Sequence, residues 1–88
     1  MHAAVEISLY PLGEDYIPRI LAFIERLNRH RDLRVVTNDL STQIWGELHH
    51  VMRVLSEEFE RAANDGPQLI FVMKVLPKLA APAASAPT

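Results

Sequence analysis

Two amphipathic helix patterns, each flanked by strand patterns, constrain the fold of this chain most strongly. Residues 4–12 alternate between apolar and polar side chains, which is typical of a strand with one face in a core. Residues 16–27 and 47–62 instead repeat apolar side chains every three or four positions, as an amphipathic helix does. The remaining strand patterns cover residues 33–38, 41–46 and 68–76. The order of elements is therefore strand, helix, strand, strand, helix and strand.

This order predicts an α+β domain of the ferredoxin-like βαββαβ type over residues 1–78. Each crossover connection should be right-handed, which places two helices on one face of a four-stranded antiparallel sheet. We expect the first and third strands to be central and to run parallel to each other. Residues 79–88 are rich in Ala and Pro and offer little apolar surface to bury, so we predict a disordered tail there.

The last strand predicts a second apolar surface, because it is apolar on both faces except at Lys74. The helices would cover one face of the sheet and leave the other open. The residues expected on the open face are Tyr10, Ile70, Val72, Leu76 and either Trp45 or Ile44. Exposed apolar patches of this kind usually mark interfaces. We therefore predict a symmetric homo-oligomer, a dimer or a tetramer, that forms through the open sheet face.

The composition of the 88 residues excludes several classes of function. The chain has no cysteine, which rules out disulfides, thiolate metal sites and thiol catalysis. A net charge of −2 provides no basic surface for nucleic acid or for an anionic membrane. No apolar run reaches the length of a membrane span, and the N-terminus lacks an export-signal pattern. We expect a cytoplasmic protein with no nucleic-acid or membrane partner.

Catalytic and metal sites find little support in the sequence. His49 and His50 would point about 100° apart on a helix, so we expect solvated surface histidines and no metal site. A phosphate-handling enzyme of this fold would need an anion cradle after the first strand, whereas residues 11–15 carry acidic side chains. The charged residues of the second helix are expected to form a solvated face, namely Arg53, Glu57, Glu58, Glu60 and Arg61. We therefore expect no catalytic residues and no enzyme activity.

The segment 35–46 carries an unusual density of uncharged hydrogen-bonding side chains for a predicted hairpin. These side chains are Thr37, Asn38, Ser41, Thr42 and Gln43. Hydroxyl and amide groups of this kind suit a small polar heterocycle better than acid–base catalysis. The alternative is that Asn38, Asp39 and Ser41 are simply turn formers. Thr42 and Gln43 point to opposite faces of their strand, so at most one of them is expected to contact a ligand.

Glu6 would place a carboxylate in the middle of the sheet, where burial is costly unless the charge is paired. One interpretation is a salt bridge to Lys74 on the neighbouring last strand, or to Arg34. The other is a counter-charge or hydrogen-bond acceptor for a cationic, amine-bearing ligand. The residues alone leave both interpretations open.

Three segments of the chain match a known pattern: residues 6–12 (Glu-Ile-Ser-Leu-Tyr-Pro-Leu), the helix with Tyr16, Ile20, Phe23 and Ile24, and the run Thr37-Asn38…Leu40-Ser41-Thr42-Gln43…Gly46. Together they resemble the YkoF-like thiamin/hydroxymethylpyrimidine-binding family from about residue 4 to residue 77. The resemblance implies a ferredoxin-like fold, dimers or tetramers built through the sheets, and binding of thiamin or its pyrimidine half without catalysis or a cofactor. Some members carry two tandem domains. Here a site completed between repeats would have to be completed between subunits.

The resemblance and the residue chemistry together give a set of candidate ligand-binding residues. An aminopyrimidine needs amide and hydroxyl partners, whereas a cationic thiazolium favours aromatic or carboxylate neighbours. The candidates for the first role are Ser8, Asn38, Thr42 and Gln43, and those for the second are Glu6, Tyr10 and Trp45. We expect the ligand at the polar hairpin or at a subunit interface.

Two functions from different classes follow. The first is a small-molecule binder for thiamin or hydroxymethylpyrimidine, acting in uptake, salvage or buffering. The second is an oligomeric regulatory or scaffolding module without a small ligand, in which the polar hairpin only sets the assembly. A polar-lined cavity large enough for a heterocycle would favour the first, and a dry, filled sheet contact would favour the second.

Overall fold

The structure is a computed structural model, and it describes residues 1–13 and 16–79. Its elements are β1 (His2–Pro11), α1 (Tyr16–Asn28), β2 (Arg34–Thr37), β3 (Thr42–Glu47), α2 (Leu48–Asn64) and β4 (Leu69–Leu76). The predicted βαββαβ order is confirmed, and each strand boundary lies within two residues of the prediction. Of the predicted tail, residues 80–88 lie outside the described residues. Leu79 is described, and its amide donates a hydrogen bond to the carbonyl of His2 at 3.0 Å.

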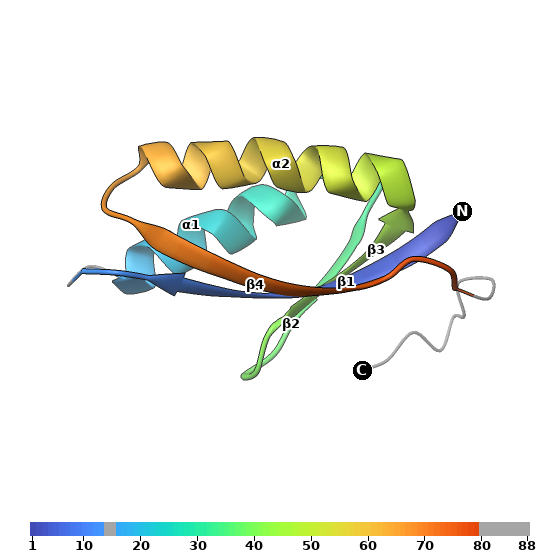
Figure 1. The fold of residues 1–88 in the computed structure, drawn as a ribbon, viewed down its shortest axis with the longest axis horizontal. Helices are drawn as coiled ribbons and strands as arrows, with labels where there is room; N and C mark the ends of the chain where they lie inside the picture. Colours follow the sequence, from blue (N-terminus) through green and yellow to red (C-terminus); the bar gives the residue numbers. More distant parts are fainter. Residues whose placement is uncertain (14–15, 80–88) are drawn as a thin grey trace.

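The four strands form one antiparallel sheet in the order β2-β3-β1-β4, and both helices pack on the same face of it (Figure 1). The central position of β1 and β3 is confirmed, but the prediction that they run parallel is wrong. The crossover through α1 brings β2 into the direction of β1. The tight turn after β2 then reverses the chain, so β3 must run antiparallel to β1.

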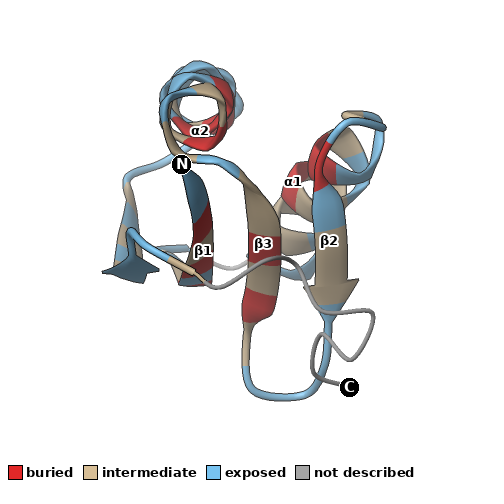
Figure 2. Cartoon of the chain, turned by 90° about the vertical axis from the view of Figure 1, so that its right-hand side faces the viewer, coloured by how far each residue is buried: buried red, intermediate tan, exposed pale blue. Residues whose placement is uncertain are grey.

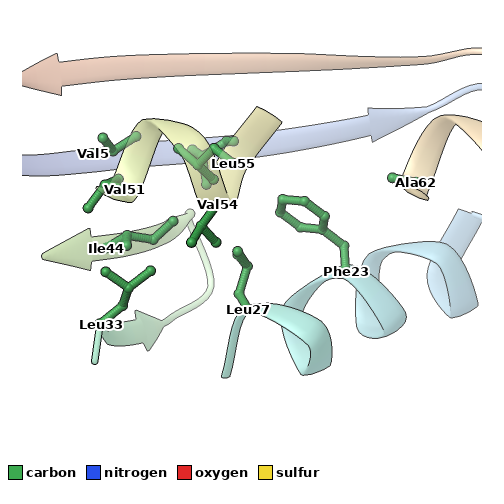
Figure 3. Packing of buried hydrophobic residues seen from close by; sticks show 10 residues of the cluster. Val5, Phe23, Leu27, Leu33, Ile44, Val51, Val54, Leu55 and Ala62 are labelled. Atoms are coloured by element: carbon green, nitrogen blue, oxygen red, sulfur yellow. The ribbon is translucent and has the colours of Figure 1, made fainter. Parts of the chain in front are cut away.

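The core lies between the sheet and the two helices (Figure 2). Alternate residues of the central strands point toward the helices, and Val5, Ile7 and Ile44 are fully buried there. The helices contribute larger side chains such as Leu27 and Leu55 (Figure 3). Met52 and Met73 pack against this cluster, as expected for flexible core fillers. Burial on one face of each element therefore explains the periodicity of the sequence.

Glu47 joins β3 to α2. Its carboxylate accepts the backbone amides of His49 and His50 at 3.0 and 3.2 Å, which satisfies two unpaired donors of the first helical turn. The His49 hydrogen bond is the main reason that the pKa of Glu47 lies below its ordinary value. The two histidines differ, contrary to the prediction. His49 is exposed, whereas His50 is half-buried and contacts Asp32.

The other face of the sheet is open and apolar, as predicted. Tyr10, Ile70, Val72 and Leu76 are each about half exposed. Trp45 is the central-strand aromatic on this face, because it neighbours Ile44, whose side chain is buried on the helix side. The guanidinium of Arg34 lies over the Trp45 ring at 5.6 Å from its centre.

The prediction that Glu58 lies on a solvated face of α2 is wrong. The residue is only 1% exposed. Its carboxylate accepts hydrogen bonds from Arg26 at 2.8 Å, from His30 at 3.1 Å and from Arg61 at 3.0 Å. Glu58 lies four residues after Val54, on the buried stripe of α2, so helical spacing turns it inward. This Glu58 cluster (Arg26, His30, Glu58 and Arg61) ties α1 to α2.

Candidate functional site

A cavity of about 230 Å³ lies between α1, the second half of β1 and the turn that joins β2 to β3. Its walls on the helix side are apolar and come from two elements, with Ile7 and Leu9 on β1 and Ile20, Phe23 and Ile24 on α1. The hairpin side is polar instead and is formed by Thr37, Asn38, Ser41 and Thr42. The cavity therefore combines an apolar body with a polar end, as small-molecule sites commonly do.

Two threonines, the exposed Thr37 and the buried Thr42, belong to the polar end. Thr37 and Thr42 face each other across the β2–β3 pair, and their hydroxyl oxygens are 3.0 Å apart. Thr42 is only 5% exposed. The hydrogen bond between them uses one of two hydroxyl protons, so one proton and several lone pairs keep the capacity to bind a ligand.

Asn38 shapes the turn, and its side-chain nitrogen has only one long contact. Its side-chain oxygen accepts the amides of Leu40 and Ser41 at 2.9 and 3.1 Å, so the turn-former interpretation is correct for this oxygen. Its side-chain nitrogen is 3.5 Å from the amide oxygen of Gln43, the upper limit for a hydrogen bond. The Asn38 amide group therefore still has donor capacity.

Four of the six predicted site residues are among those that border the cavity, namely Ser8, Tyr10, Asn38 and Thr42. Ser8 and Tyr10 alternate with Ile7 and Leu9, so they lie on the same face of β1 as Glu6 and border the cavity only at its edge. Glu6 and Gln43 do not line it. They pair with each other across β1 and β3, on the open face of the sheet. Of the two neighbours Thr42 and Gln43, Thr42 is thus the one that faces the cavity, because successive strand residues alternate between faces.

Glu6 and Gln43 belong to a polar network on the open face. The Ser41 hydroxyl donates to the Glu6 carboxylate at 3.0 Å, and the Gln43 amide donates to the Ser41 hydroxyl at 2.7 Å. Lys74 lies 3.8 Å from the other Glu6 oxygen, which is the salt bridge considered from the sequence. The Glu6 carboxylate therefore has two protein partners and lies outside the cavity.

Several cavity residues were not predicted from the sequence. Ile20, Phe23 and Ile24 follow the ordinary apolar stripe of a helix, and that stripe does not distinguish a cavity wall from a filled core. Asp39 and Leu40 also line the cavity, and Leu40 is 87% exposed. A leucine within a polar turn is the one signal in the sequence that could have indicated this side of the cavity.

The described residues offer no alternative metal centre or membrane segment. Within residues 1–13 and 16–79, no three His, Asp or Glu side chains are close enough together to hold a metal ion. No helix in the same part of the chain is long and apolar enough to cross a membrane.

Comparison with solved structures shows the same fold in several organisms. A Thermotoga maritima protein assigned provisionally to thiamine biosynthesis or salvage has a TM-score of 0.80 at 18% identity, covering 89% of this chain and 85% of its own. A Streptococcus pneumoniae protein has a TM-score of 0.80 at 22% identity, covering 97% and 93%. A hypothetical protein of Methanocaldococcus jannascii has a TM-score of 0.76 at 23% identity, covering 91% and 84%.

At these identities the solved structures establish the fold alone. No curated protein sequence matches the chain. The sequence pattern of the YkoF-related family, however, matches residues 2–76, which include every strand and helix of the structure. The earlier resemblance is thereby confirmed over the whole folded part, and the chain belongs to the YkoF-related family.

Proposed function

We propose that this protein is a non-catalytic binding protein for hydroxymethylpyrimidine or thiamin, acting in uptake, salvage or buffering. The observation that carries the proposal is the cavity between α1 and the β2–β3 turn, with apolar walls and a polar end of hydroxyl and amide groups. Membership of the YkoF-related family supports it. So does the likeness to the Thermotoga maritima protein assigned provisionally to thiamine biosynthesis or salvage.

The two parts of the cavity match the two parts of an aminopyrimidine. The flat faces of the ring would contact Phe23 and the aliphatic side chains of α1 and β1. The ring nitrogens need donors, which the Asn38 amide and the free threonine proton supply, and the exocyclic amino group needs acceptors, which the threonine oxygens supply. The polar end thus offers both donors and acceptors to an aminopyrimidine.

Size favours the pyrimidine half over the complete two-ring molecule. The cavity measures about 230 Å³, below the range of roughly 300–1,000 Å³ that is common for drug-sized ligands. A single ring fits inside it. The thiazolium of thiamin would then lie at the mouth, beside the exposed Leu40.

The chemistry of the lining supports binding rather than catalysis. Among the described lining residues there is no His, Lys or Arg, and the one carboxylate, Asp39, is exposed to solvent. General acid–base catalysis depends on a positioned group whose pKa is matched to its task. Hydroxyl and amide side chains orient a ligand instead.

Calorimetric titration with hydroxymethylpyrimidine and with thiamin tests the proposal. We expect saturable binding of both to the unmodified protein, and no heat above dilution for either would overturn the function. Thr42→Val keeps the shape of the side chain and removes its hydroxyl, so it should weaken binding by about 1–3 kcal/mol. Ser56→Ala on the exposed side of α2 is the matched hydroxyl deletion and should leave affinity unchanged.

The open sheet face favours a second candidate, an oligomeric regulatory or scaffolding module. Four exposed apolar side chains on this face, Tyr10, Ile70, Val72 and Leu76, support a homo-oligomer built through it. Sedimentation at micromolar concentration should show a species heavier than the 10.0 kDa chain, and Val72→Glu should dissociate it. An oligomer that binds neither ligand would leave this candidate and remove the first.

A further inference from the structure

The described lining of the cavity carries an acidic side chain and no basic one. Asp39 is the only charged side chain among its described lining residues, and it lies on the exposed turn between β2 and β3. The arginines of α1 are engaged away from the cavity. Arg19 donates to the carbonyls of Ala62 and Pro67, and Arg26 pairs with Glu58. No described lysine or arginine lines the cavity, so its single charge is acidic.

The turn also offers no cluster of free amides that would hold an anion, because three of the four amides of residues 38–41 are engaged. Backbone N–H groups that converge on one point commonly bind phosphate in such turns. Here the amides of Leu40 and Ser41 are occupied by the Asn38 side-chain oxygen, and the amide of Asn38 itself donates to the Ser41 carbonyl at 3.0 Å. Three amides of the turn are therefore committed to its own internal hydrogen bonds.

We propose that the cavity selects the unphosphorylated form of its ligand, and that Asp39 is the specificity-determining residue that discriminates against the phosphate ester. The inference rests on the proposed function, since it concerns the same cavity. It assigns the preference for a neutral or cationic ligand to Asp39, a role that one of the two interpretations of the sequence gives to Glu6. Glu6 has its own partners, Ser41 and Lys74, on the open sheet face.

The phosphate ester is expected to bind more weakly than the unphosphorylated ligand in either orientation. A phosphate monoester carries about −1.5 to −2 charges at neutral pH. If the ester group enters the cavity, it loses its water and meets no cation among the described lining residues, which is costly. If it stays at the mouth, it approaches the Asp39 carboxylate. A thiazolium at the same mouth is attracted by that carboxylate, so affinity should fall as ligand charge becomes more negative.

Calorimetry with hydroxymethylpyrimidine and its monophosphate ester tests this, because the two share one ring. We expect the unmodified protein to bind the alcohol about ten- to a hundredfold more tightly than the ester, the effect of leaving a charged group without partners. Asp39→Lys should reduce this ratio by about tenfold, and Asp39→Asn should reduce it by less. Raising the salt concentration should shrink the difference between these variants.

Glu57→Lys is the matched control, since it makes the same charge change on an exposed position of α2 outside the cavity lining. It should leave the ratio of the two affinities unchanged. Equal binding of alcohol and ester by the unmodified protein would overturn the inference and leave the proposed function standing. The inference would also be overturned if the ratio of alcohol affinity to ester affinity were the same in Asp39→Lys as in the unmodified protein. Failure of both alcohol and thiamin to bind would overturn the function and this inference together.

Discussion

Two polar groupings in this small fold differ in how completely their hydrogen bonds are made. In the Glu58 cluster, one buried carboxylate is held by three donors from Arg26, His30 and Arg61. At the polar end of the cavity, Thr37 and Thr42 share one hydrogen bond, and the Asn38 nitrogen has only a long contact. Buried polar groups in folded proteins are normally satisfied, and the buried Glu58 carboxylate is, although one buried Arg26 nitrogen has no partner. The cluster is therefore a structural tie, whereas the exposed Thr37 and Asn38 side chains keep hydrogen-bonding capacity that solvent or a ligand can fill.

The largest effect is expected from breaking the Glu58 cluster. Glu58→Ala should lower the free energy of unfolding by about 2–4 kcal/mol, because Arg26 and His30 would be left partly buried without their partner. Chemical denaturation measures it, and Glu60→Ala on the exposed side of the same helix is the control. Ligand affinity at temperatures below melting should stay the same. A stability loss no larger than that of the control would mean that the cluster is not a structural tie.

The same carboxylate should make stability depend on acid pH. Burial acts to raise the pKa of Glu58, but the hydrogen bonds from His30 and Arg26 outweigh it and hold the pKa below its ordinary value. A group with a lowered folded pKa stabilises the protein above its unfolded pKa, about 4.3 for glutamate. That stabilisation is lost as the pH falls through the folded pKa. Denaturation curves between pH 7 and pH 3 should show the loss, and Glu58→Gln should flatten it.

Changes at the polar end of the cavity should alter ligand affinity more than the stability of the fold. Asn38→Asp keeps the oxygen that accepts the Leu40 and Ser41 amides and removes the donor nitrogen, so it should weaken hydroxymethylpyrimidine binding by about 1–3 kcal/mol while the turn persists. Asn38→Ala should lose both the ligand contact and the turn contacts. Calorimetry and thermal melting of the two variants separate the roles. A melting temperature that falls equally in both would assign the amide to folding alone.

The smallest effect is expected at Glu6. Its pair with Lys74 is 3.8 Å long, and the two side chains are 45% and 84% exposed, so solvent screens the attraction. Glu6→Gln should change stability by less than about 1 kcal/mol and should leave the ratio of the affinities for thiamin and hydroxymethylpyrimidine unchanged. A loss of thiamin affinity alone, measured by calorimetry, would return Glu6 to the ligand site.

Periodicity alone determined much of this protein. The period of two and the period of 3.6 gave the order of elements, the helix-covered face and the open apolar face, because each records which side of one element meets a core. The hairpin composition marked Asn38 and Thr42, since few strands concentrate uncharged hydrogen-bonding groups. These features are local, so they can be read from neighbouring residues.

Only the tertiary structure decided the rest, because it depends on which elements meet. The direction of β3 follows from combining a crossover with a turn. The burial of Glu58 depends on Arg26 and His30, about 30 positions away in the chain. The position of Glu6 outside the cavity depends on the strand register, since a shift of one residue exchanges the two faces. Asp39 lines the cavity because the β2–β3 turn lies beside α1 and β1. A cavity wall and a filled core have the same apolar pattern in sequence, and only packing distinguishes them.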